Sequence, residues 1–182
     1  MILNFLLFSV FFILGAYYVF RHVVRDDYRE YLKLSSFSTL LEVLVFVIHA
    51  NSIYLILPTA WPDIPELPSS LLLRIMSIVI FVVGLAILLI AWFGLGSNAS
   101  LGKDENQLNT DGIYKFSRNP QLLAYGVLLS SVVVMFFSWL TILWILLYII
   151  ASYFMIKSEE EFLKIKYGQE YEEYFNSVPR IL

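Results

Sequence analysis

The chain contains no cysteine, so disulfides, thiolate zinc sites, iron–sulfur clusters and a cysteine nucleophile are all excluded. Its two histidines, His22 and His49, lie far apart in the sequence and are poor material for a metal site. Charge is also scarce: 12 Lys and Arg residues stand against 15 Asp and Glu residues, and the net charge of −3 argues against a nucleic-acid partner. The sequence therefore predicts no bound metal and no nucleic acid.

Long uncharged segments make up most of the chain. Apolar and aromatic residues account for 59% of its 182 residues, which is too high a fraction for a soluble domain. The few charges are grouped in clusters between these segments, so a bilayer is the expected solvent. We expect an all-α integral membrane protein in which residues 1–182 form a single membrane domain.

Five apolar segments predict five transmembrane helices, at residues 2–20, 35–57, 71–95, 122–137 and 139–156. The first segment carries no charge and has 19 residues. As a helix it would extend about 28 Å, close to the thickness of the hydrocarbon core. The fourth and fifth segments meet at a short junction, which predicts an antiparallel helical hairpin.

Basic residues are distributed unevenly among the connecting segments, and their distribution predicts the orientation. Eleven of the 12 Lys and Arg residues follow the first, third or fifth predicted helix. The other side, with residues 58–70 and the hairpin turn, has no basic residue outside a predicted helix. Because cytoplasmic loops carry the excess of Lys and Arg, we expect the N-terminus outside and the C-terminus in the cytoplasm.

Two segments on the predicted cytoplasmic side are longer than a connection requires. Residues 96–120 are polar and end in a proline that can open a helix. Residues 157–182 predict a cytoplasmic amphipathic helix, because large side chains recur at spacings of three and four residues. Gly168 interrupts this pattern and predicts a bend.

Two ionisable residues lie inside the second predicted helix. Glu42 and His49 are seven residues apart and therefore share one helical face. Ionisable groups at membrane depth are functional candidates. The alternative is that both side chains only pack against neighbouring helices or headgroups, and the sequence leaves both interpretations open.

Three short motifs carry the chemical information. The first is LNTDGIY at residues 108–114, and the second is RNP at residues 118–120. The third follows the predicted hairpin and consists of Glu159, Glu160, Leu163, Tyr167, Gly168, Tyr171 and Tyr174. All three lie on the predicted cytoplasmic side, which would make that side the active face.

This arrangement resembles the isoprenylcysteine carboxyl methyltransferase family of integral-membrane enzymes. The family pattern is L-x-T-x-G-x-Y, then R-[HN]-P-x-Y, then a transmembrane hairpin, and finally E-E-x-x-L-x-x-x-[FY]-G-x-x-Y-x-x-Y. Each motif alone is weak, whereas three in order around a hairpin are fairly specific. The resemblance covers residues 106–180, and the first three predicted helices are similar only in number and hydrophobicity.

The resemblance implies methyl transfer from S-adenosylmethionine, bound by residues 106–180 at the cytoplasmic mouth of the last two helices. The carboxylate of S-adenosylmethionine suits an arginine, and its ribose diol or amino group suits a protein carboxylate. Methyl transfer from a sulfonium is an in-line displacement, and positioning of donor and acceptor can supply much of its rate. We therefore assign no catalytic side chain. The cofactor contacts implied by the resemblance, together with Arg118 for the carboxylate, are Gln107, Leu108, Asn109, Tyr114, Arg118, Asn119, Pro120, Leu122 and Glu159.

The sequence departs from the family pattern at two positions. The tyrosine of R-[HN]-P-x-Y is Leu122 here, and Tyr125 follows one helical turn later. The arginine that prenylcysteine enzymes use for the substrate carboxylate aligns with Met155. A prenylcysteine acceptor is therefore not expected, and the implied acceptor is a lipophilic or membrane-associated small molecule, with a thiol or carboxyl group among the options.

Two other functions remain open at this stage. Steroid-reductase-like membrane oxidoreductases share a similar R-x-P and G-x-x-Y-x-x-Y pattern and use NADPH. The sequence offers few basic groups for the phosphates of that cofactor. A non-catalytic membrane protein of the same fold, in contact only with membrane lipids, is the second alternative.

Overall fold

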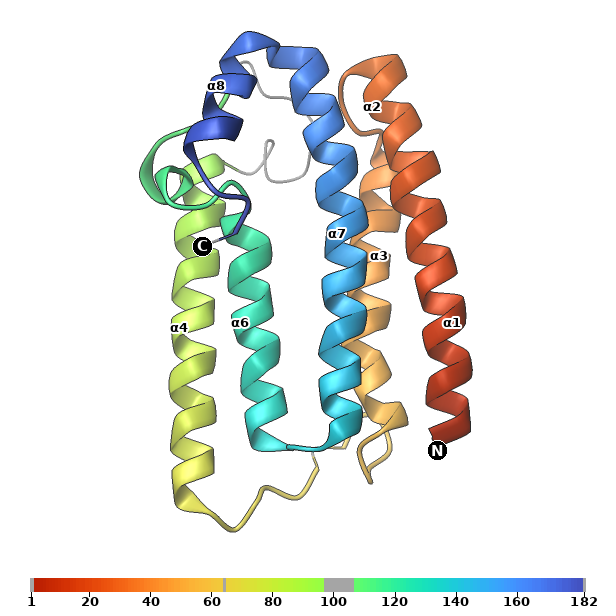
Figure 1. Cartoon of the computed structure of the whole chain (residues 1–182). Helices are drawn as coiled ribbons and strands as arrows, with labels where there is room; N and C mark the ends of the chain where they lie inside the picture. The colour runs from red at the N-terminus through yellow and green to blue at the C-terminus, as the bar shows by residue number, and fades with distance from the viewer. Residues whose placement is uncertain (1, 64, 97–106, 182) are drawn as a thin grey trace.

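The computed structural model describes residues 2–63, 65–96 and 107–181, and these residues form helices and no strand (Figure 1). The predicted all-α class is confirmed for this part of the chain. Lys103, which was counted in the orientation prediction, and residue 106, the start of the predicted cofactor-binding region, lie outside the described residues.

The first predicted span is the beginning of a longer helix. The helix α1 (Ile2–Tyr18) continues into a π-helical turn, η1 (Val19–Val24), and then into α2 (Arg25–Tyr31). It ends at Leu32, whose φ of 54° is left-handed. The charged residues after the predicted span therefore extend the helix instead of ending it.

The second and third spans begin at serine caps. The helix α3 (Ser36–Asn51) follows Ser35, and α4 (Leu71–Leu95) follows Ser70. Each serine hydroxyl accepts a hydrogen bond from a backbone N–H in the first turn of its helix, which satisfies a donor that would otherwise lack a partner. A short 3₁₀ turn, η2 (Ser52–Leu55), extends α3.

The fourth and fifth helices form the predicted antiparallel hairpin (Figure 1). The helix α6 (Pro120–Met135) starts with proline, whose missing N–H costs nothing in the first turn. The helix α7 (Trp139–Tyr167) starts with a capping box between Ser138 and Thr141. Because only residues 136–138 separate the end of α6 from the start of α7, α7 runs back along α6.

The segment that was expected to be one amphipathic helix is divided in two. Its first part continues α7 to Tyr167, and its second part is the separate helix α8 (Gln169–Ser177). The division falls at Gly168, whose φ of 54° is left-handed and favours glycine. The interruption predicted at this glycine is confirmed.

Four helices in the described residues are long and apolar enough to cross a membrane: Ile2–Tyr31, Ser36–Leu55, Leu71–Leu95 and Trp139–Tyr167. The helix α6 has 16 residues and is shorter than the roughly 20 residues that a crossing usually takes. The count of five spans therefore stays a prediction.

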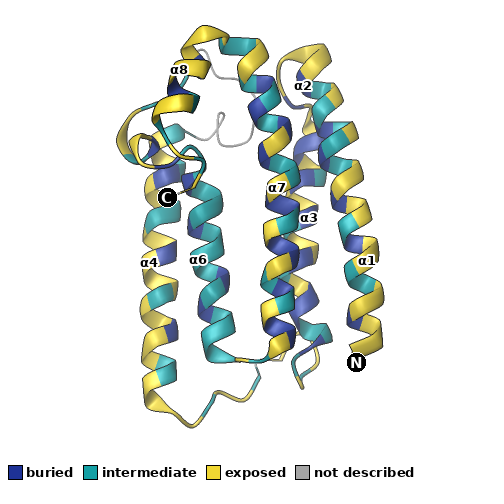
Figure 2. Cartoon of the chain, in the orientation of Figure 1, coloured by how far each residue is buried: buried dark blue, intermediate teal, exposed yellow. Residues whose placement is uncertain are grey.

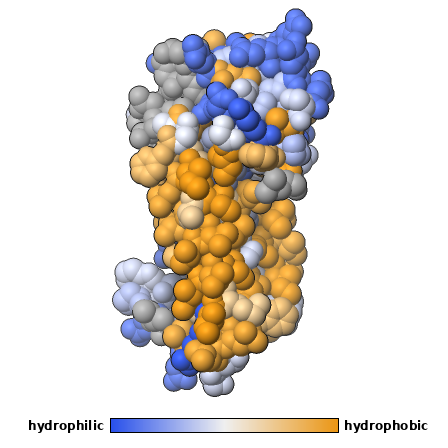
Figure 3. Space-filling model, turned by 90° about the vertical axis from the view of Figure 1, so that its left-hand side faces the viewer, coloured by the Kyte–Doolittle hydropathy of each residue, from blue (hydrophilic) through white to orange (hydrophobic). Residues whose placement is uncertain are grey.

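The helices present apolar side chains to the outside. In α4 only Ser77, Gly84 and Ala91 are buried, and exposed residues cover most of the helix (Figure 2). Figure 3 shows an apolar band between hydrophilic ends. Such a surface suits lipid, because helices satisfy their backbone groups internally. We call the end of the bundle that carries α2, α8 and the 3₁₀ turn η3 (Gly112–Lys115) the polar end.

The helices α3 and α7 are joined by a reciprocal pair of bonds at His49. The ring Nε2 of His49 lies 2.9 Å from the carbonyl oxygen of Trp144, and the indole Nε1 of Trp144 donates to the carbonyl of His49 over 2.9 Å. The two rings stack with centroids 4.7 Å apart. His49 is fully buried, so the structure favours the packing interpretation of this residue.

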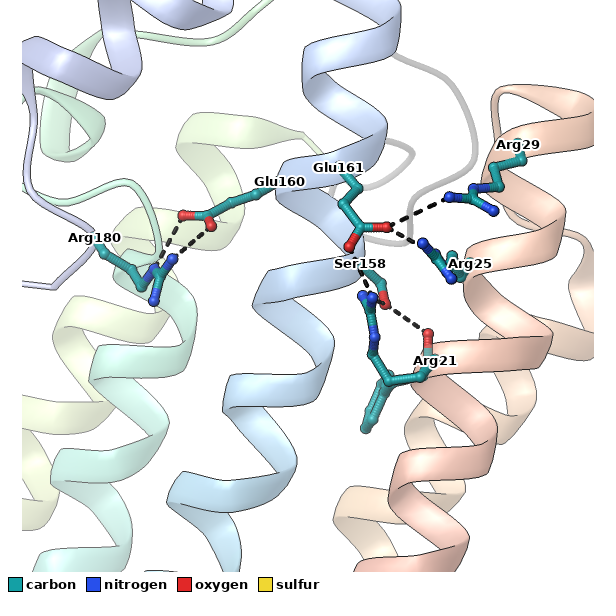
Figure 4. A network of polar contacts seen from close by, with 8 residues as sticks. Arg21, Arg25, Arg29, Ser158, Glu160, Glu161 and Arg180 are labelled. Carbon is teal, nitrogen blue, oxygen red and sulfur yellow. Dashed lines mark hydrogen bonds and ion pairs between the residues drawn. The ribbon is translucent and has the colours of Figure 1, made fainter.

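A cluster of arginines joins the first helix to α7 near the polar end (Figure 4). Arg21 and Arg25 each donate to the carboxylate of Glu161 over 2.7 Å. Ser158 donates to the carbonyl of Phe20 in the π-helical turn over 2.6 Å and accepts from Arg21 over 3.0 Å. The π-helical turn is therefore tied to α7 by its backbone and by its side chains.

Candidate cofactor site

A cavity of about 450 Å³ lies toward the polar end, between α3, α6 and α7. Residues of α2 and α4 and of the segment before α6 complete its walls. Most of the lining is apolar, with a few polar groups. This volume and this lining are typical of sites for small molecules and cofactors.

The cavity brings together most of the predicted cofactor residues, which come from two segments far apart in the sequence. Gln107, Leu108 and Asn109 do not line it. Instead, the side-chain amide of Asn109 donates to the carbonyl of Gly94 at the end of α4 over 2.9 Å. The predicted residues that line the cavity are Tyr114, Arg118, Asn119, Pro120, Leu122 and Glu159.

The turn η3 is held in place by two tyrosines. Tyr174 of α8 donates from its hydroxyl to the carbonyl of Tyr114 over 2.7 Å, and the hydroxyl of Tyr114 donates to the carbonyl of Ala91 in α4 over 3.4 Å. Burial raises the pKa of Tyr174 to about 12, so its hydroxyl stays a donor at neutral pH. Tyr114 is thus fixed between α4 and α8.

The C-terminal residues 178–181, which we call the strap, cross the segment before α6. The backbone N–H of Arg118 donates to the carbonyl of Pro179 over 3.0 Å. The side-chain amide of Asn119 donates to the carbonyl of Arg180 over 3.0 Å, and the hydroxyl of Ser117 donates to the same carbonyl over 3.3 Å. No motif in the sequence reveals the strap, because its carbonyl groups make these contacts.

Glu160 joins the strap to this segment through two arginines. Its carboxylate accepts from Arg180 over 3.0 and 2.6 Å (Figure 4), and it lies 3.2 Å from Arg118. The bond to Glu160 raises the pKa of the Arg180 guanidinium above its usual value. One buried carboxylate therefore pairs with two cations, of which Arg118 lines the cavity.

Arg118 keeps two donors for a ligand. Its side chain is 7% exposed, and its guanidinium lies over the ring of Phe175 with its central carbon 3.8 Å from the ring centroid. Among the described residues, neither Nε nor Nη1 has a hydrogen-bond partner. Because buried donors without a partner are costly, these two atoms suit an anionic ligand group such as a carboxylate.

The deeper part of the cavity is more apolar and contains the residues at which the family pattern changes. Met155 and Tyr125 both line it, and the Tyr125 ring packs edge-on against Tyr148 with centroids 5.3 Å apart. Glu42 from α3 also lines it and is 8% exposed. Glu42 was a functional candidate from its position in the second predicted helix, but no sequence pattern connects it to the motifs.

The cavity therefore has two chemically different parts. Arg118, Asn119 and Glu159 near the polar end can bind a polar molecule that carries a carboxylate, hydroxyls and an amino group. The deeper part can hold an apolar molecule, and a polar group of that molecule could lie next to Glu42. The described residues contain no cluster of His, Cys, Asp and Glu side chains that could hold a metal ion.

A family model for phospholipid methyltransferases matches residues 72–170, which is more than half of the chain. The chain belongs to the phospholipid methyltransferase family. No curated protein and no solved structure matches the chain significantly.

The phospholipid methyltransferase family consists of integral-membrane methyltransferases related to the isoprenylcysteine carboxyl methyltransferases. The resemblance inferred from the motifs is therefore confirmed, and the protein is a membrane methyltransferase. The match begins in α4 and ends in α8, so it includes all nine predicted cofactor residues and all but the first residue of the third predicted span. Glu42 and Arg180 lie outside it.

Proposed function

We propose that this phospholipid methyltransferase family member transfers a methyl group from S-adenosylmethionine to a lipophilic acceptor that enters the cavity from the membrane. The observation that carries the proposal is the convergence of six predicted cofactor residues on one cavity. They come from the segment before α6, from α6 itself and from α7, so the hairpin is what brings them together.

The donors and acceptors in the outer part of the cavity suit this cofactor. The two unpartnered donors of Arg118 suit its carboxylate, and Glu159 suits its amino group or ribose hydroxyls. Tyr114, beside them, suits the sulfonium cation. When bound, S-adenosylmethionine supplies an activated methyl group, and the role of these residues is to hold it toward the deeper part of the cavity.

The cavity is also accessible from the apolar outer surface. Val43 and Val47 of α3 line it, and each is 47% exposed at the level of the apolar band. Neither residue offers a polar group to water. A lipophilic acceptor can therefore reach the cavity along α3 while the cofactor binds near the polar end, and the orientation predicted from basic residues would place that end in the cytoplasm.

Calorimetric titration of the purified protein with S-adenosylhomocysteine tests the proposal. We expect saturable binding to the wild type, and Asn119→Ala and Glu159→Ala should each weaken it about tenfold or more, because each removes a hydrogen-bonding group from a buried site. Exposed Glu170 lies outside the cavity, and Glu170→Gln should leave the affinity unchanged.

Titration with NADPH provides the comparison with the oxidoreductase alternative. Tighter binding of NADPH than of S-adenosylhomocysteine would overturn the proposal. A folded protein that binds neither molecule would instead favour a non-catalytic member of the family.

A further inference from the structure

Three arginines of the first helix surround one acid of α7 (Figure 4). Arg21, Arg25 and Arg29, which we call the arginine cluster, follow one another at intervals of four residues. The carboxylate of Glu161 accepts from Arg21 and Arg25 over 2.7 Å, whereas the Nη2 atom of Arg29 lies 4.0 Å from it. Exposure of these side chains rises from 11% at Arg21 to 51% at Arg29, so the outermost cation is accessible to a ligand.

Lys157 adds a fourth cation beside the arginine cluster. It is exposed and lies one helical turn before Glu161, on the same side of α7. Within the described part of the chain, no hydrogen bond or ion pair joins Lys157 to another residue. Four cations therefore share one carboxylate on this surface.

The acids of α2 do not pair with these cations. Asp27 accepts from the backbone N–H of Ser35 over 2.8 Å. Asp26 and Glu30 each follow an arginine of the cluster directly, and successive residues of an α-helix are about 100° apart around its axis. In the structure as described, neither forms an ion pair with the cluster. An excess of positive charge therefore faces outward between α2 and α7.

This charged surface lies at the boundary between the apolar band and the polar end. Tyr17 of α1 and Tyr153 of α7 each lie four residues before one of the cations, and both are about half exposed. Tyr17 packs edge-on against Phe154 of α7, with ring centroids 5.4 Å apart. Further along α7, Leu146 and Ile149 are exposed. Because tyrosines are enriched at the headgroup level of membranes, the cations beyond them lie at the level of lipid phosphates.

We propose that the arginine cluster and Lys157 bind the phosphate group of an anionic phospholipid, whose chains lie along the exposed apolar residues of α7. Guanidinium groups bind phosphate oxygens through several N–H donors at once. Basic clusters next to a transmembrane helix are typical of sites for anionic lipid headgroups. A zwitterionic headgroup fits less well, because its own cation would meet the same positive excess.

The lipid site is separate from the cavity and independent of the proposed function. The arginine cluster and Lys157 are not among the described residues that line the cavity. Glu161 is two residues from Glu159, which places the two acids on nearly opposite sides of α7. The arginine cluster also lies outside the residues that match the family model. A bound lipid would hold the first helix against α7 without entering the cavity.

The test is native mass spectrometry of the purified full chain in a neutral detergent, titrated with dioleoyl-phosphatidylglycerol or dioleoyl-phosphatidylcholine. The two probes have the same chains and both contain a phosphate, but only phosphatidylglycerol has a net negative charge. We expect phosphatidylglycerol to bind about tenfold more tightly, because it meets several uncompensated cations. Equal affinities, or tighter binding of phosphatidylcholine, would overturn the inference.

Two substitutions assign the preference to this surface. Arg29→Gln and Lys157→Gln each remove one cation without breaking a short ion pair, so both variants should fold. Each should lower the affinity for phosphatidylglycerol about fivefold, as expected for one basic residue near an anionic lipid, and leave that for phosphatidylcholine unchanged. The matched control is Lys115→Gln, which removes an exposed cation elsewhere at the polar end and should change neither affinity. Unchanged phosphatidylglycerol affinity in both cluster variants would contradict the proposal.

A further probe distinguishes a lipid from a free phosphate. Glycerol 1-phosphate has the charged group without the chains, and about a hundredfold excess should not displace the lipid, because it buries no apolar surface. Displacement would show that the site takes a soluble phosphate and would overturn the assignment to a lipid. Circular dichroism unfolding with the wild-type midpoint shows that the variants are folded. Failure of S-adenosylhomocysteine to bind would contradict the proposed function and leave this inference standing.

Discussion

At the scale of single residues, Glu160 connects the candidate cofactor site to the strap. It is 9% exposed and pairs with Arg118 on one side and Arg180 on the other. A buried pair contributes little net stability when intact, but the loss of one partner leaves an uncompensated charge. Arg118, with a 7% exposed side chain, would be that charge if Glu160 were removed.

Glu160→Ala should therefore lower the free energy of unfolding by about 3 kcal/mol. Arg118 would lose the acid that holds its guanidinium over Phe175, so affinity for S-adenosylhomocysteine should fall as well. Denaturant unfolding of the protein in detergent and calorimetric titration measure the two effects.

The matched control is the ion pair between Lys115 and Asp111, whose atoms are 3.1 Å apart and whose side chains are 62% and 87% exposed. Surface pairs of this kind contribute roughly 0–1 kcal/mol. Asp111→Ala should therefore change stability little. Equal losses in the two variants would show that burial of Glu160 does not determine its effect.

Residue types and spacing could point to some residues of the cavity and its surroundings and not to others. Arg118, Asn119 and Glu159 could be named because they belong to motifs with fixed spacing. Arg180 could not, because its pairing with Glu160 depends on how the chain turns after α8. Glu42 could be recognised as unusual from its depth alone, but its position opposite the motifs depends on the packing of α3.

At the scale of secondary-structure elements, the contact between α4 and α6 depends on one glycine. A Cβ atom placed on Gly84 would lie 2.9 Å from the backbone nitrogen of Leu128 and 3.2 Å from the carbonyl oxygen of Ala124. Small residues allow helix backbones to approach closely in membranes. Gly84 therefore sets the separation of these two helices, and α6 carries one wall of the cavity.

Gly84→Ala should destabilise the protein by about 1–3 kcal/mol, because the added methyl group forces the α4 and α6 backbones apart. Thermal unfolding followed by circular dichroism measures the loss. Gly15 of α1 has nothing within 4 Å of the corresponding position, so Gly15→Ala should be neutral or stabilising through its helix propensity. A Gly84→Ala protein as stable as Gly15→Ala would show that α4 and α6 can separate without cost.

Hydrophobic segments predicted the helices well and their ends less well. The starts of α4 and α7 coincide with the predictions, because serine caps and the apolar pattern are local signals. The end of α7 was placed 11 residues early, at Ile156 instead of Tyr167, because charge at a membrane boundary does not end a helix. The helix α7 ends at Gly168, where the backbone becomes left-handed.

At the scale of the whole molecule, the bundle has two ends, and the distribution of basic residues predicts which side of the membrane each end faces. Glu66 is exposed near the predicted outer end, and Glu170 is exposed on α8 at the polar end. The sequence contains no cysteine, so a single introduced cysteine is the one thiol that a reagent can label.

A membrane-impermeant maleimide should label Glu66→Cys in intact cells and Glu170→Cys only after the membrane is permeabilised, as the excess of basic residues at the polar end predicts. Gel shift or mass spectrometry measures the labelling. The reverse pattern would invert the proposed orientation and would require the cofactor to enter from the other compartment.

The general architecture was predictable because composition and segment length determine that helices cross a bilayer. The cavity was not predictable. It forms where α3 faces α6 and α7, and no local sequence pattern encodes that contact. The first three predicted spans carry no recognisable motif, yet α3 and the residue after α2 contribute Glu42, Val43 and Leu32 to the cavity wall.

The stacking of Trp144 on His49 gives the protein an optical reporter of its own. Trp144 is 1% exposed and its ring lies face to face with an imidazole, and burial of an indole away from water shifts its emission to shorter wavelength. The same two helices, α3 and α7, both line the cavity. A molecule that enters the cavity and disturbs this stack would shift the emission of Trp144, so its arrival could be followed in real time without any attached dye.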